Sequence, residues 1–575
     1  MNLARLLRMR PDEIRTRAQQ AVSKRWARPP ALRLVSSAAR PLFPDPPPAA
    51  SPEKICRHRF DLLGYQDLDF GSPIDWHLDP VHGKRAPQIP WYRIPFLDFD
   101  QVGDHKIIWE LNRHQHLVTL AQAGCRDEIL AQWTHWQSQN PYPIGINWAS
   151  TLEVAFRALS WLWVRHLIGD FHPDLLPALH LHGWHIERYL STYFSPNTHL
   201  LGEGVALFTL GLMCPRIADA SRWRQRGWDI VLRQADLQVR PDGFHFEQSV
   251  YYHIYALDFF RFAQDLAARN DIAIPARFQR TVEQMEEALA ILTQSGPPPN
   301  FGDDDGGRVI ASPRPRIAVP PRPLPNAGIY PTGTPDAQLF IDAGPQGALS
   351  AGHGHADALS VQLIARGRRV LIDPGTYCYV CPDRDRFRGT AAHNTLQIDG
   401  RDQSDPRGPF GWAKVTQTVV DCWRSTETCD LFAGHHNGYH PVIHQRWVFA
   451  LKPGFWLVRD LVTGPGRHRL DLHWHFLDER DLTILPLAGH NWSRSVQSWD
   501  SSPVYGRKEP AFVLRFTTET TLPAEFAVVL RIGEPSGALT QTGPGSYCYT
   551  EPGAAHEFTF GERFTYRGEA TEFSV

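Results

Sequence analysis

The sequence predicts an α+β multidomain protein, with a helical N-terminal half followed by an antiparallel β-sandwich. From about residue 105 to 295 the apolar residues recur at helical spacing. A proline-rich stretch then runs from Pro313 to Pro325, and beyond it apolar and polar residues alternate with a period of two. A chain of 575 residues is also too long for one ordinary core.

The first predicted unit is an N-terminal arm, residues 1–52. Leu3, Leu6 and Leu7 share one side of a basic amphipathic helix, and arginines occupy the other sides. We expect this helix to dock on the protein surface, and contact with a membrane surface is the alternative. The proline-rich run from Pro41 to Pro52 then predicts an extended connector.

The start of the chain carries no recognisable export signal. It is basic, but no apolar segment of signal-peptide length follows. No apolar run approaches the length of a transmembrane helix either. The sequence therefore predicts a cytoplasmic location by default, and a periplasmic or envelope-associated location is the alternative.

The helical domain is predicted to span residues 53–312. In the segment from Trp148 to Ile168, Leu152, Phe156 and Leu159 are among the apolar residues at helical spacing. Segments with the same pattern are Leu200–Leu212, Ile230–Leu237, Ile254–Leu266 and Arg280–Leu292. Repeated helices with short loops and many aromatic residues predict a helical bundle or an incomplete α/α toroid.

A linker at residues 313–332 leads to the predicted β-sandwich at residues 333–575. Leu470, Leu472, Trp474 and Phe476 alternate with polar residues, as expected for a strand. Other predicted strands are Ser360–Ile364, Val370–Ile372, Phe512–Phe516 and Phe526–Ile532. Glycine and proline clusters separate these runs at short intervals, which is typical of an all-β sandwich.

The composition narrows the class of ligand. The net charge is −2, so no global positive field is available to attract nucleic acid, and an anionic ligand needs a local basic cleft. The chain has 19 Trp, 16 Tyr and 30 Phe, which serve either to hold sugar rings or to fill large cores. Eight cysteines in a chain this long do not make a disulfide scaffold. Cys378 and Cys381 form a lone Cys-x-x-Cys, for which a redox role is the minor interpretation.

The strongest local motif is Gly352-His353-Gly354-His355-Ala356-Asp357. In an extended segment His353 and His355 lie on the same face. Asp373 follows at the end of a predicted strand, and His393 follows in Ala391-Ala392-His393-Asn394-Thr395. Two histidines and an aspartate suit a divalent metal, most readily zinc. The alternative is a set of unrelated histidines and a turn aspartate.

The helical half contains two further motifs. In the first, Asn197 precedes an apolar helix, and His199 and Glu203 form an i, i+4 pair on it. Helix capping is the alternative role for Asn197. In the second, a turn at Asp242-Gly243 leads into a helix with three tyrosines, which serve either the site or the core. They are Tyr251, Tyr252 and Tyr255.

Two charged segments complete the candidates. Arg384, Arg386 and Arg388 precede His393 and suit recognition of carboxylate or sulfate, or else form a solvated loop. The run Asp303–Gly307 lacks the rest of a calcium-binding loop and is better interpreted as a turn.

Taken in order, these motifs resemble the heparinase II/III-like polysaccharide lyases. The Asn-Trp-Ala-Ser-Thr-Leu-Glu start at Asn147, the Asn-x-His-Leu-x-Gly-Glu segment at Asn197 and the Asp-Gly-x-x-x-Glu-x-Ser-x-Tyr-Tyr-His segment at Asp242 are similar to the helical domain of that family. His-Gly-His-Ala-Asp, Ile-Asp-Pro-Gly and His-Asn-Thr are similar to its C-terminal domain. The resemblance implies an α/α toroid followed by an antiparallel β-sandwich, with a cleft between them. It also implies β-elimination at a uronic acid.

The resemblance also implies residue roles. Asn197 would neutralise the uronate carboxylate, and Tyr252 would act as base, acid or both. His353 is the second acid–base candidate. The remaining substrate contacts would come from His199, Glu203, Glu247, Tyr251 and Arg388, and the metal ligands would be His355, Asp373 and His393.

One position departs from the family pattern, because Thr198 stands where related enzymes often have a second asparagine. The implied partner is an acidic polysaccharide, and the lack of an export signal favours a link to exopolysaccharide production. A glycoside hydrolase would instead need paired carboxylates, for which Glu153, Glu203 and Glu247 are available. The third hypothesis is a non-catalytic polysaccharide-binding or assembly protein.

Overall fold

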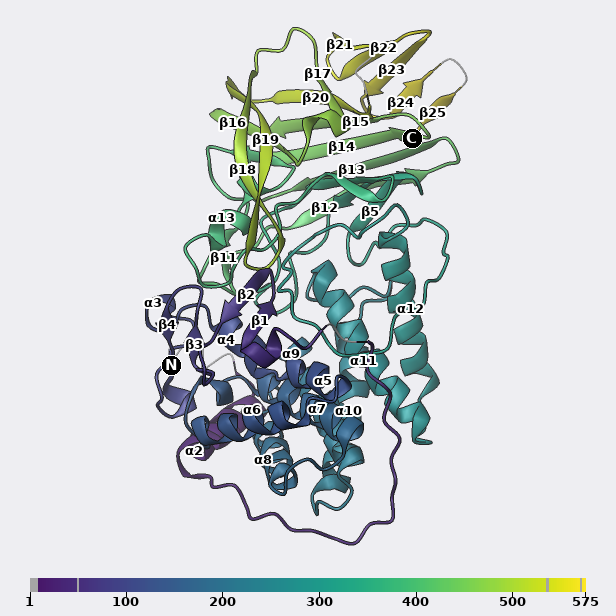
Figure 1. Cartoon of the computed structure of the whole chain (residues 1–575). Coiled ribbons are helices and arrows are strands. Elements are labelled where there is room, and N and C mark those ends of the chain that lie inside the picture. Colours follow the sequence, from purple (N-terminus) through teal and green to yellow (C-terminus); the bar gives the residue numbers. More distant parts are fainter. Residues whose placement is uncertain (1–8, 49–50, 534–536, 569–570) are drawn as a thin grey trace.

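The computed structural model describes residues 9–48, 51–533, 537–568 and 571–575. Helices make up one half of the molecule and strands the other (Figure 1). The predicted order of a helical half followed by a strand-rich half is therefore confirmed.

The N-terminal arm begins with helix α2 (Pro11–Trp26). The guanidinium of Arg17 donates to the carbonyl of Tyr193 at 2.6 Å, and the side-chain amide of Gln20 donates to the carbonyl of Leu190 at 3.1 Å. The helix thus docks on the helical domain. Leu3, Leu6 and Leu7, on which the predicted amphipathic pattern rests, lie outside the described residues.

Four helical hairpins form the body of the N-terminal domain within the described residues. Each pairs an inner helix with the helix that follows it, and the inner helices α5, α7, α9 and α11 pack in that order. The α-helices of the domain are α3 (Phe99–Val102), α4 (His105–Asn112), α5 (Gln115–Gln122), α6 (Arg126–Gln139), α7 (Thr151–Ile168), α8 (Leu175–Arg188), α9 (Thr198–Met213), α10 (Ala220–Gln238), α11 (Val250–Arg269) and α12 (Ala276–Leu292). This alternation of inner and outer helices is an incomplete α/α toroid.

The sequence of each helix fits its position in this arrangement. In α7 every residue from Thr151 to Val164 is buried, as expected for a helix that is apolar on all sides and surrounded by others. The outer helix α10 instead buries a single stripe that includes Trp223, Val231 and Ala235. The inner helices therefore form the core, and their N-terminal ends are available for the site.

Helices α9 and α10 approach each other closely at glycines. A Cβ on Gly227 would lie 2.2 Å from the backbone nitrogen of Phe208 and 2.5 Å from the carbonyl oxygen of Gly204. A Cβ on Gly211 would lie 2.2 Å from the backbone nitrogen of Arg224. Only glycine leaves room for the two backbones here, so these positions set how closely α9 and α10 pack.

The predicted boundaries need two corrections. Residues 53–312 were expected to be helical, but they include four short strands, β1 (Arg59–Leu62), β2 (Tyr65–Asp69), β3 (Leu78–Asp79) and β4 (Lys84–Arg85). These hairpins are too short to show a clear period of two. The first strand of the C-terminal half begins at Ile329, inside the predicted linker at 313–332.

The C-terminal half consists of stacked antiparallel sheets. One four-stranded sheet contains β5 (Ile329–Thr334), β6 (Ala337–Asp342), β7 (Val361–Ala365) and β8 (Arg368–Leu371). A six-stranded sheet, in spatial order, contains β12 (Thr418–Ser425), β13 (Cys429–His436), β14 (Ile443–Leu451), β15 (Trp456–Thr463), β20 (Ala524–Ile532) and β17 (Leu482–Pro486). The second four-stranded sheet contains β18 (Ser493–Val504), β19 (Arg507–Thr521), β16 (Arg467–Phe476) and β9 (Leu396–Ile398).

A five-stranded sheet ends the chain, with β21 (Ala538–Gly543), β22 (Ser546–Glu551), β23 (Ala554–Phe560), β24 (Phe564–Arg567) and β25 (Glu572–Ser574). Two apolar cores separate the layers. One joins both four-stranded sheets to the six-stranded sheet and includes Trp474 and Phe516. The other lies between the six-stranded and five-stranded sheets and includes Phe449 and Tyr566. The predicted β-sandwich is therefore confirmed, with an additional outer layer.

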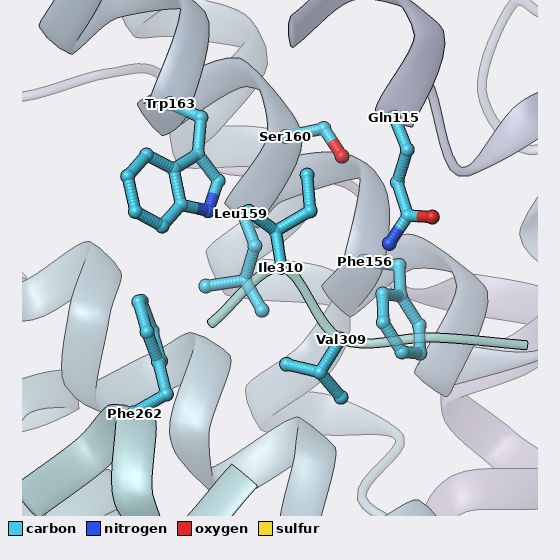
Figure 2. Close-up of a pocket in the computed structure, with 8 residues that line it drawn as sticks. All are labelled: Gln115, Phe156, Leu159, Ser160, Trp163, Phe262, Val309 and Ile310. Carbon is cyan, nitrogen blue, oxygen red and sulfur yellow. The ribbon is translucent and has the colours of Figure 1, made fainter. Parts of the chain in front are cut away.

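The segment that leaves the helical domain packs back onto it before the sandwich begins. Figure 2 shows Val309 and Ile310 lying over Phe156 and Leu159 of α7. The side chain of Gln115 donates to the carbonyl of Arg308 at 2.7 Å. The cavity that remains here has a volume of about 10 Å³, enough for one water molecule and far too small for a sugar.

None of the helices in the described ranges is both long enough and apolar enough to cross a bilayer.

We expect Gly227→Ala to destabilise the helical domain, because the added methyl group must push α10 away from α9. Overpacking of this kind costs about 1–3 kcal/mol. Thermal unfolding would measure the loss. A matched control is Gly543→Ala, whose added Cβ meets only the Cβ of Ser546 at 3.9 Å. Equal melting temperatures for the two variants would contradict the predicted contact.

Candidate active site

The first turn of α11 points a tyrosine at the junction of the two domains. Ser249 caps this helix, because its hydroxyl accepts from the backbone N–H of Tyr252 at 3.1 Å. The phenol of Tyr252 donates to Asp305 at 3.1 Å and lies 3.0 Å from the phenol of Tyr379. Tyr379 belongs to the loop after β8, so this contact joins the helical domain to the sandwich.

His353 lies directly against this tyrosine. The two rings stack with centroids 3.8 Å apart. On the other side, Nδ1 of His353 lies 3.1 Å from Asp303, and Nε2 lies 3.5 Å from Glu247. Burial disfavours the charged imidazole, but the hydrogen bond to Asp303 and the charge of Glu247 outweigh it and raise the pKa of His353.

Asn197 reaches the same group of residues from the N-terminus of α9. Its side-chain N–H donates to Oε2 of Glu247 at 2.6 Å, the oxygen that also faces His353. Its side-chain oxygen accepts from the backbone N–H of His199 at 3.1 Å, which caps the helix. Helix capping, the alternative considered from the sequence, is therefore present, and the amide N–H of the same side chain binds Glu247.

The neighbouring Thr198 does not replace an amide. It is fully buried, and its hydroxyl has no hydrogen-bond partner among the described residues. Its backbone N–H donates to Oε1 of Glu247 at 3.2 Å. Glu247 is thus held by two consecutive residues of α9 and its cap, and burial raises the pKa of this carboxyl.

His199 and Tyr251 are half-buried beside this cluster. Burial lowers the pKa of His199 to about 4, although the charge of Glu153 opposes the shift, so the imidazole is neutral at neutral pH. The ring of Tyr251 lies 5.7 Å from that of Tyr252. Its hydroxyl has no hydrogen-bond partner among the described residues, although it is buried.

A buried carboxylate that sequence analysis assigned to a turn organises the β-domain side. Asp303 is fully buried, and its two oxygens accept from the guanidinium of Arg384 at 2.5 and 2.8 Å. One oxygen also contacts His353, and the other lies 3.0 Å from Nε2 of His355. Burial opposes ionisation, but the charge of Arg384 outweighs it and holds the pKa of Asp303 well below its usual value.

A second acidic residue of the same run connects the site to basic side chains. Lys106 of α4 lies 3.2 Å from Asp305, which also accepts from Tyr252. Arg113 forms a two-point ion pair with Glu153, at 2.6 and 2.9 Å. Despite its burial, the pKa of Asp305 is lowered to about 2 by the nearby cations. Lys106 and Arg113 therefore form a basic group next to Tyr252.

Asp303, Asp305 and Tyr379 are the site residues that sequence analysis did not select, and Arg384, which it selected for carboxylate or sulfate recognition, binds the carboxylate of Asp303. The usable signal was three consecutive aspartates before Gly306-Gly307, because such a run is costly to bury without cations nearby. A Cβ on Gly307 would lie 2.4 Å from a guanidinium nitrogen of Arg113, so the glycine there permits the basic side chains to approach.

The predicted metal ligands come together. One donor atom from each of His355, Asp373 and His393 lies within 4.8 Å of the others, and all three residues are buried. Nδ1 of His355 has no protein partner among the described residues, while its Nε2 is oriented by Asp303. Nδ1 of His393 lies 2.7 Å from Asp373. A donor set of two nitrogens and one oxygen, with a carboxylate behind one imidazole, fits a divalent metal.

The Cys-x-x-Cys pair lies beside the site as a disulfide. Cys378 and Cys381 are bonded and flank Tyr379. The backbone N–H of Tyr379 donates to the hydroxyl of Tyr505 at 2.9 Å. Both contacts hold the segment that presents Tyr379 to Tyr252.

Comparison with known proteins identifies the family of the chain. A family model described as the heparinase II/III N-terminus matches residues 49–308, and a model described as heparinase II/III-like, C-terminal, matches residues 317–518. The chain belongs to the heparinase II/III-like family. The two matches leave residues 1–48 and 519–575 outside the family region.

Several relatives of this family are similar along most of the chain. A heparin-sulfate lyase of Pedobacter heparinus is 24% identical, over 80% of this chain and 76% of that protein. A heparin-sulfate lyase of Bacteroides stercoris is 21% identical, over 79% of this chain and 74% of that protein. Among solved structures, a heparinase III superposes with a TM-score of 0.68 at 16% identity, covering 97% of this chain and 94% of the other. This superposition supports the fold.

Two of the residues expected to contact substrate in this family member lie elsewhere. Both carboxylate oxygens of Glu203 accept from Ser191, at 2.6 and 2.7 Å, in a fully buried environment. The guanidinium of Arg388 is held by Asp385 and by the carbonyls of Gly408 and Pro409. Neighbouring protein groups satisfy the hydrogen-bonding atoms of each side chain. We therefore correct the expectation that Glu203 and Arg388 contact substrate, and we leave both out of the site.

We expect Glu203→Gln to flatten the pH dependence of stability. Burial raises the pKa of Glu203 from 4.5 to about 8, against the smaller effect of its hydrogen bonds from Ser191. The folded protein therefore keeps a proton that the unfolded chain has released. Stability from this group is complete below the unfolded pKa and falls as the pH rises towards 8, by up to roughly 1.4 kcal/mol per pH unit.

Chemical denaturation in mildly acidic and mildly alkaline buffer would measure this difference. Glu562→Gln, which replaces an exposed carboxylate, is the control. If wild type and Glu203→Gln lose equal stability between the two buffers, Glu203 does not carry the proposed proton.

Proposed function

We propose that this protein is a polysaccharide lyase that cleaves a uronic-acid-containing polysaccharide by β-elimination. The observation that carries the proposal is the convergence of Asn197, Tyr252 and His353 at the domain junction. His353 stacks on Tyr252 and shares Glu247 with Asn197. These groups supply a donor for the uronate carboxylate, a proton donor and a proton acceptor within one small region.

Tyr252 is best suited to the role of acid. Burial, followed by the charge of Asp305, raises the pKa of its phenol well above the usual value. Such a phenol is protonated at neutral pH and can deliver its proton to the leaving O4 oxygen. This differs from the expected activation of the tyrosine as a base, because the cations near Asp305 are already paired with carboxylates.

His353 then serves as the base that takes the C5 proton. Asp303 holds the imidazole by Nδ1, which leaves Nε2 directed at Glu247 and the Asn197 side. Asn197 carries two N–H bonds on its amide, and Glu247 uses one of them. The second can bind the substrate carboxylate and stabilise the enolate-like state as C5 loses its proton.

The substrate class follows from the relatives and from this chemistry. The curated relatives are named heparin-sulfate lyases, which makes a sulfated glycosaminoglycan the first substrate to test. A uronate-containing bacterial exopolysaccharide would undergo the same reaction. In the alternative hydrolase, Glu153, Glu203 and Glu247 would act as acid and base, but Arg113, Ser191 and Asn197 already engage them.

His355, Asp373 and His393 are proposed to hold a zinc ion. In that position the ion would supply structural cross-linking between the β-domain loops. Asp303 contacts His355 through one oxygen and His353 through the other, so a fixed His355 also fixes the orientation of His353.

We expect Tyr252→Phe to lower turnover by about 10²–10⁴-fold without unfolding the protein, because it removes the proposed acid. The measurement is the rise in ultraviolet absorbance from unsaturated uronate ends, with heparan sulfate, alginate and exopolysaccharides as substrates. Tyr255→Phe, three residues along the same helix, removes a hydroxyl that has no hydrogen-bond partner among the described residues. It should keep its activity.

New reducing ends without ultraviolet absorbance would identify a hydrolase instead. Retained polysaccharide binding without any product, in wild type as well as in the variant, would identify a binding protein. Either result would reject the lyase.

Purified protein is expected to contain close to one divalent ion per chain, measured by elemental analysis. Asp373→Asn should lower the metal content and the melting temperature together, whereas Asp336→Asn, at an exposed position in the turn between β5 and β6, should change neither. Zinc and other divalent ions can be distinguished in the same assay. Metal-free protein whose melting temperature does not respond to a chelator or to added zinc would contradict the proposed site.

A further inference from the structure

The N-terminal arm has a charge unlike that of the rest of the chain. Its first 40 residues contain ten Lys and Arg against two Asp and Glu, a net charge of +8 in a chain whose net charge is −2. The arm also precedes residue 49, where the family match begins. The positive charge of the arm is therefore an addition to the fold that the family shares.

One face of α2 is used for docking. Arg17 and Gln20 donate to backbone carbonyls of the helical domain, and Ser23 is buried. The ammonium of Lys24 lies 5.1 Å from the centre of the Trp91 ring. These contacts fix the rotation of the helix, so the opposite face is held outward.

The outward face carries a row of apolar side chains. Ile14, Ala18, Val22 and Trp26 follow one another at intervals of four residues, which places them in one row along the helix. The exposed fractions are 41% for Ile14, 62% for Val22 and 79% for Trp26. Six of the seventeen large exposed apolar residues among those described lie between residues 14 and 42.

Basic side chains flank this row. Arg15, Arg25 and Arg28 are exposed, and none of them has an ion-pair partner among the described residues. The arm continues from α2 along the outside of the helical domain, where Figure 1 shows it as a purple extended segment without helix or strand that passes below the helices towards α11. Leu34, Val35 and Leu42 are exposed on this segment.

We propose that the outward face of α2 binds an anionic lipid surface. The row of Ile14, Val22 and Trp26 would enter the interface between headgroups and acyl chains, and the flanking arginines would contact the anionic headgroups. Tryptophan is favoured at this depth because its ring is apolar while its N–H is polar. An acidic polysaccharide would pair with the arginines but would leave the apolar row exposed to water, so lipid fits both features.

The test is flotation of the full-length protein with vesicles. Vesicles of phosphatidylcholine alone are compared with vesicles of phosphatidylcholine and phosphatidylglycerol, at low and high salt. Wild type should float with the anionic vesicles only, and less at high salt. The variants Val22→Ser/Trp26→Ser and Arg15→Gln/Arg25→Gln/Arg28→Gln should each lower the partition coefficient on the order of tenfold or more.

Matched controls carry the same changes on other surfaces. Val496→Ser/Phe512→Ser alters two exposed apolar residues of the β-domain, each 41% exposed. Arg233→Gln/Arg280→Gln/Arg494→Gln removes three exposed arginines elsewhere. Both controls should bind as wild type does, and turnover of soluble polysaccharide should be equal in all five proteins.

Three results would overturn the proposal. In the first, wild type remains with the soluble fraction at every lipid composition. In the second, the control variants lose as much binding as the α2 variants. In the third, wild type does not bind vesicles, and the arginine variant is retained less than wild type on immobilised heparan sulfate. That result would assign the arm to polysaccharide binding. These three results do not depend on the protein being a lyase, because each of them is a binding measurement.

Discussion

The site is assembled around the buried charge of Asp303. This carboxylate lies on the segment that leaves the helical domain, while Arg384, His353 and His355 all come from the sandwich. Removing one partner from a buried ion pair costs about 3–5 kcal/mol, because the remaining charge is left without compensation. The two domains therefore cannot shift at this point without a large electrostatic penalty. The imidazole orientations at the site follow from this constraint.

The geometry around that carboxylate also explains how one residue affects two functions. One oxygen of Asp303 contacts His353, and the other contacts His355. In the proposed function, a change at His355 would therefore reach His353 through a single carboxylate. Tyr252 approaches from the opposite domain and stacks on the same imidazole. The proposed base and the proposed acid would therefore lie against each other before substrate binds.

The candidate site residues were predictable through the order of their motifs. The patterns around Asn197, Tyr252 and His353 each left a structural alternative open, and only their combined resemblance to one family implied their roles. The helical and strand-rich halves were predictable for a different reason, since inner helices such as α7 and alternating strands such as β16 show their period directly.

The residues that were missed depend on contacts between distant segments. Asp303 resembles an ordinary turn residue until Arg384 is placed against it, 81 positions later in the chain. Tyr379 lies within the Cys-x-x-Cys motif, but that motif does not indicate its contact with Tyr252. Glu203 was selected wrongly because a local pattern was present without the contact that it suggested. Its spacing from His199 indicated a shared site, but its carboxylate is buried and accepts from Ser191. Single-sequence periodicity contains no information on such pairings.

The connection between the two family regions has a consequence for how such enzymes diversify. Residues 309–316 lie between the two matched models, so a genetic crossover there would join two complete family regions. The recombinant protein would take Asp303 and Asp305 from one relative and Arg384 and Tyr379 from the other. A recombinant between two relatives is then viable only if these few polar side chains are compatible where the domains meet. New substrate preferences can arise when whole halves are exchanged and this interface is preserved.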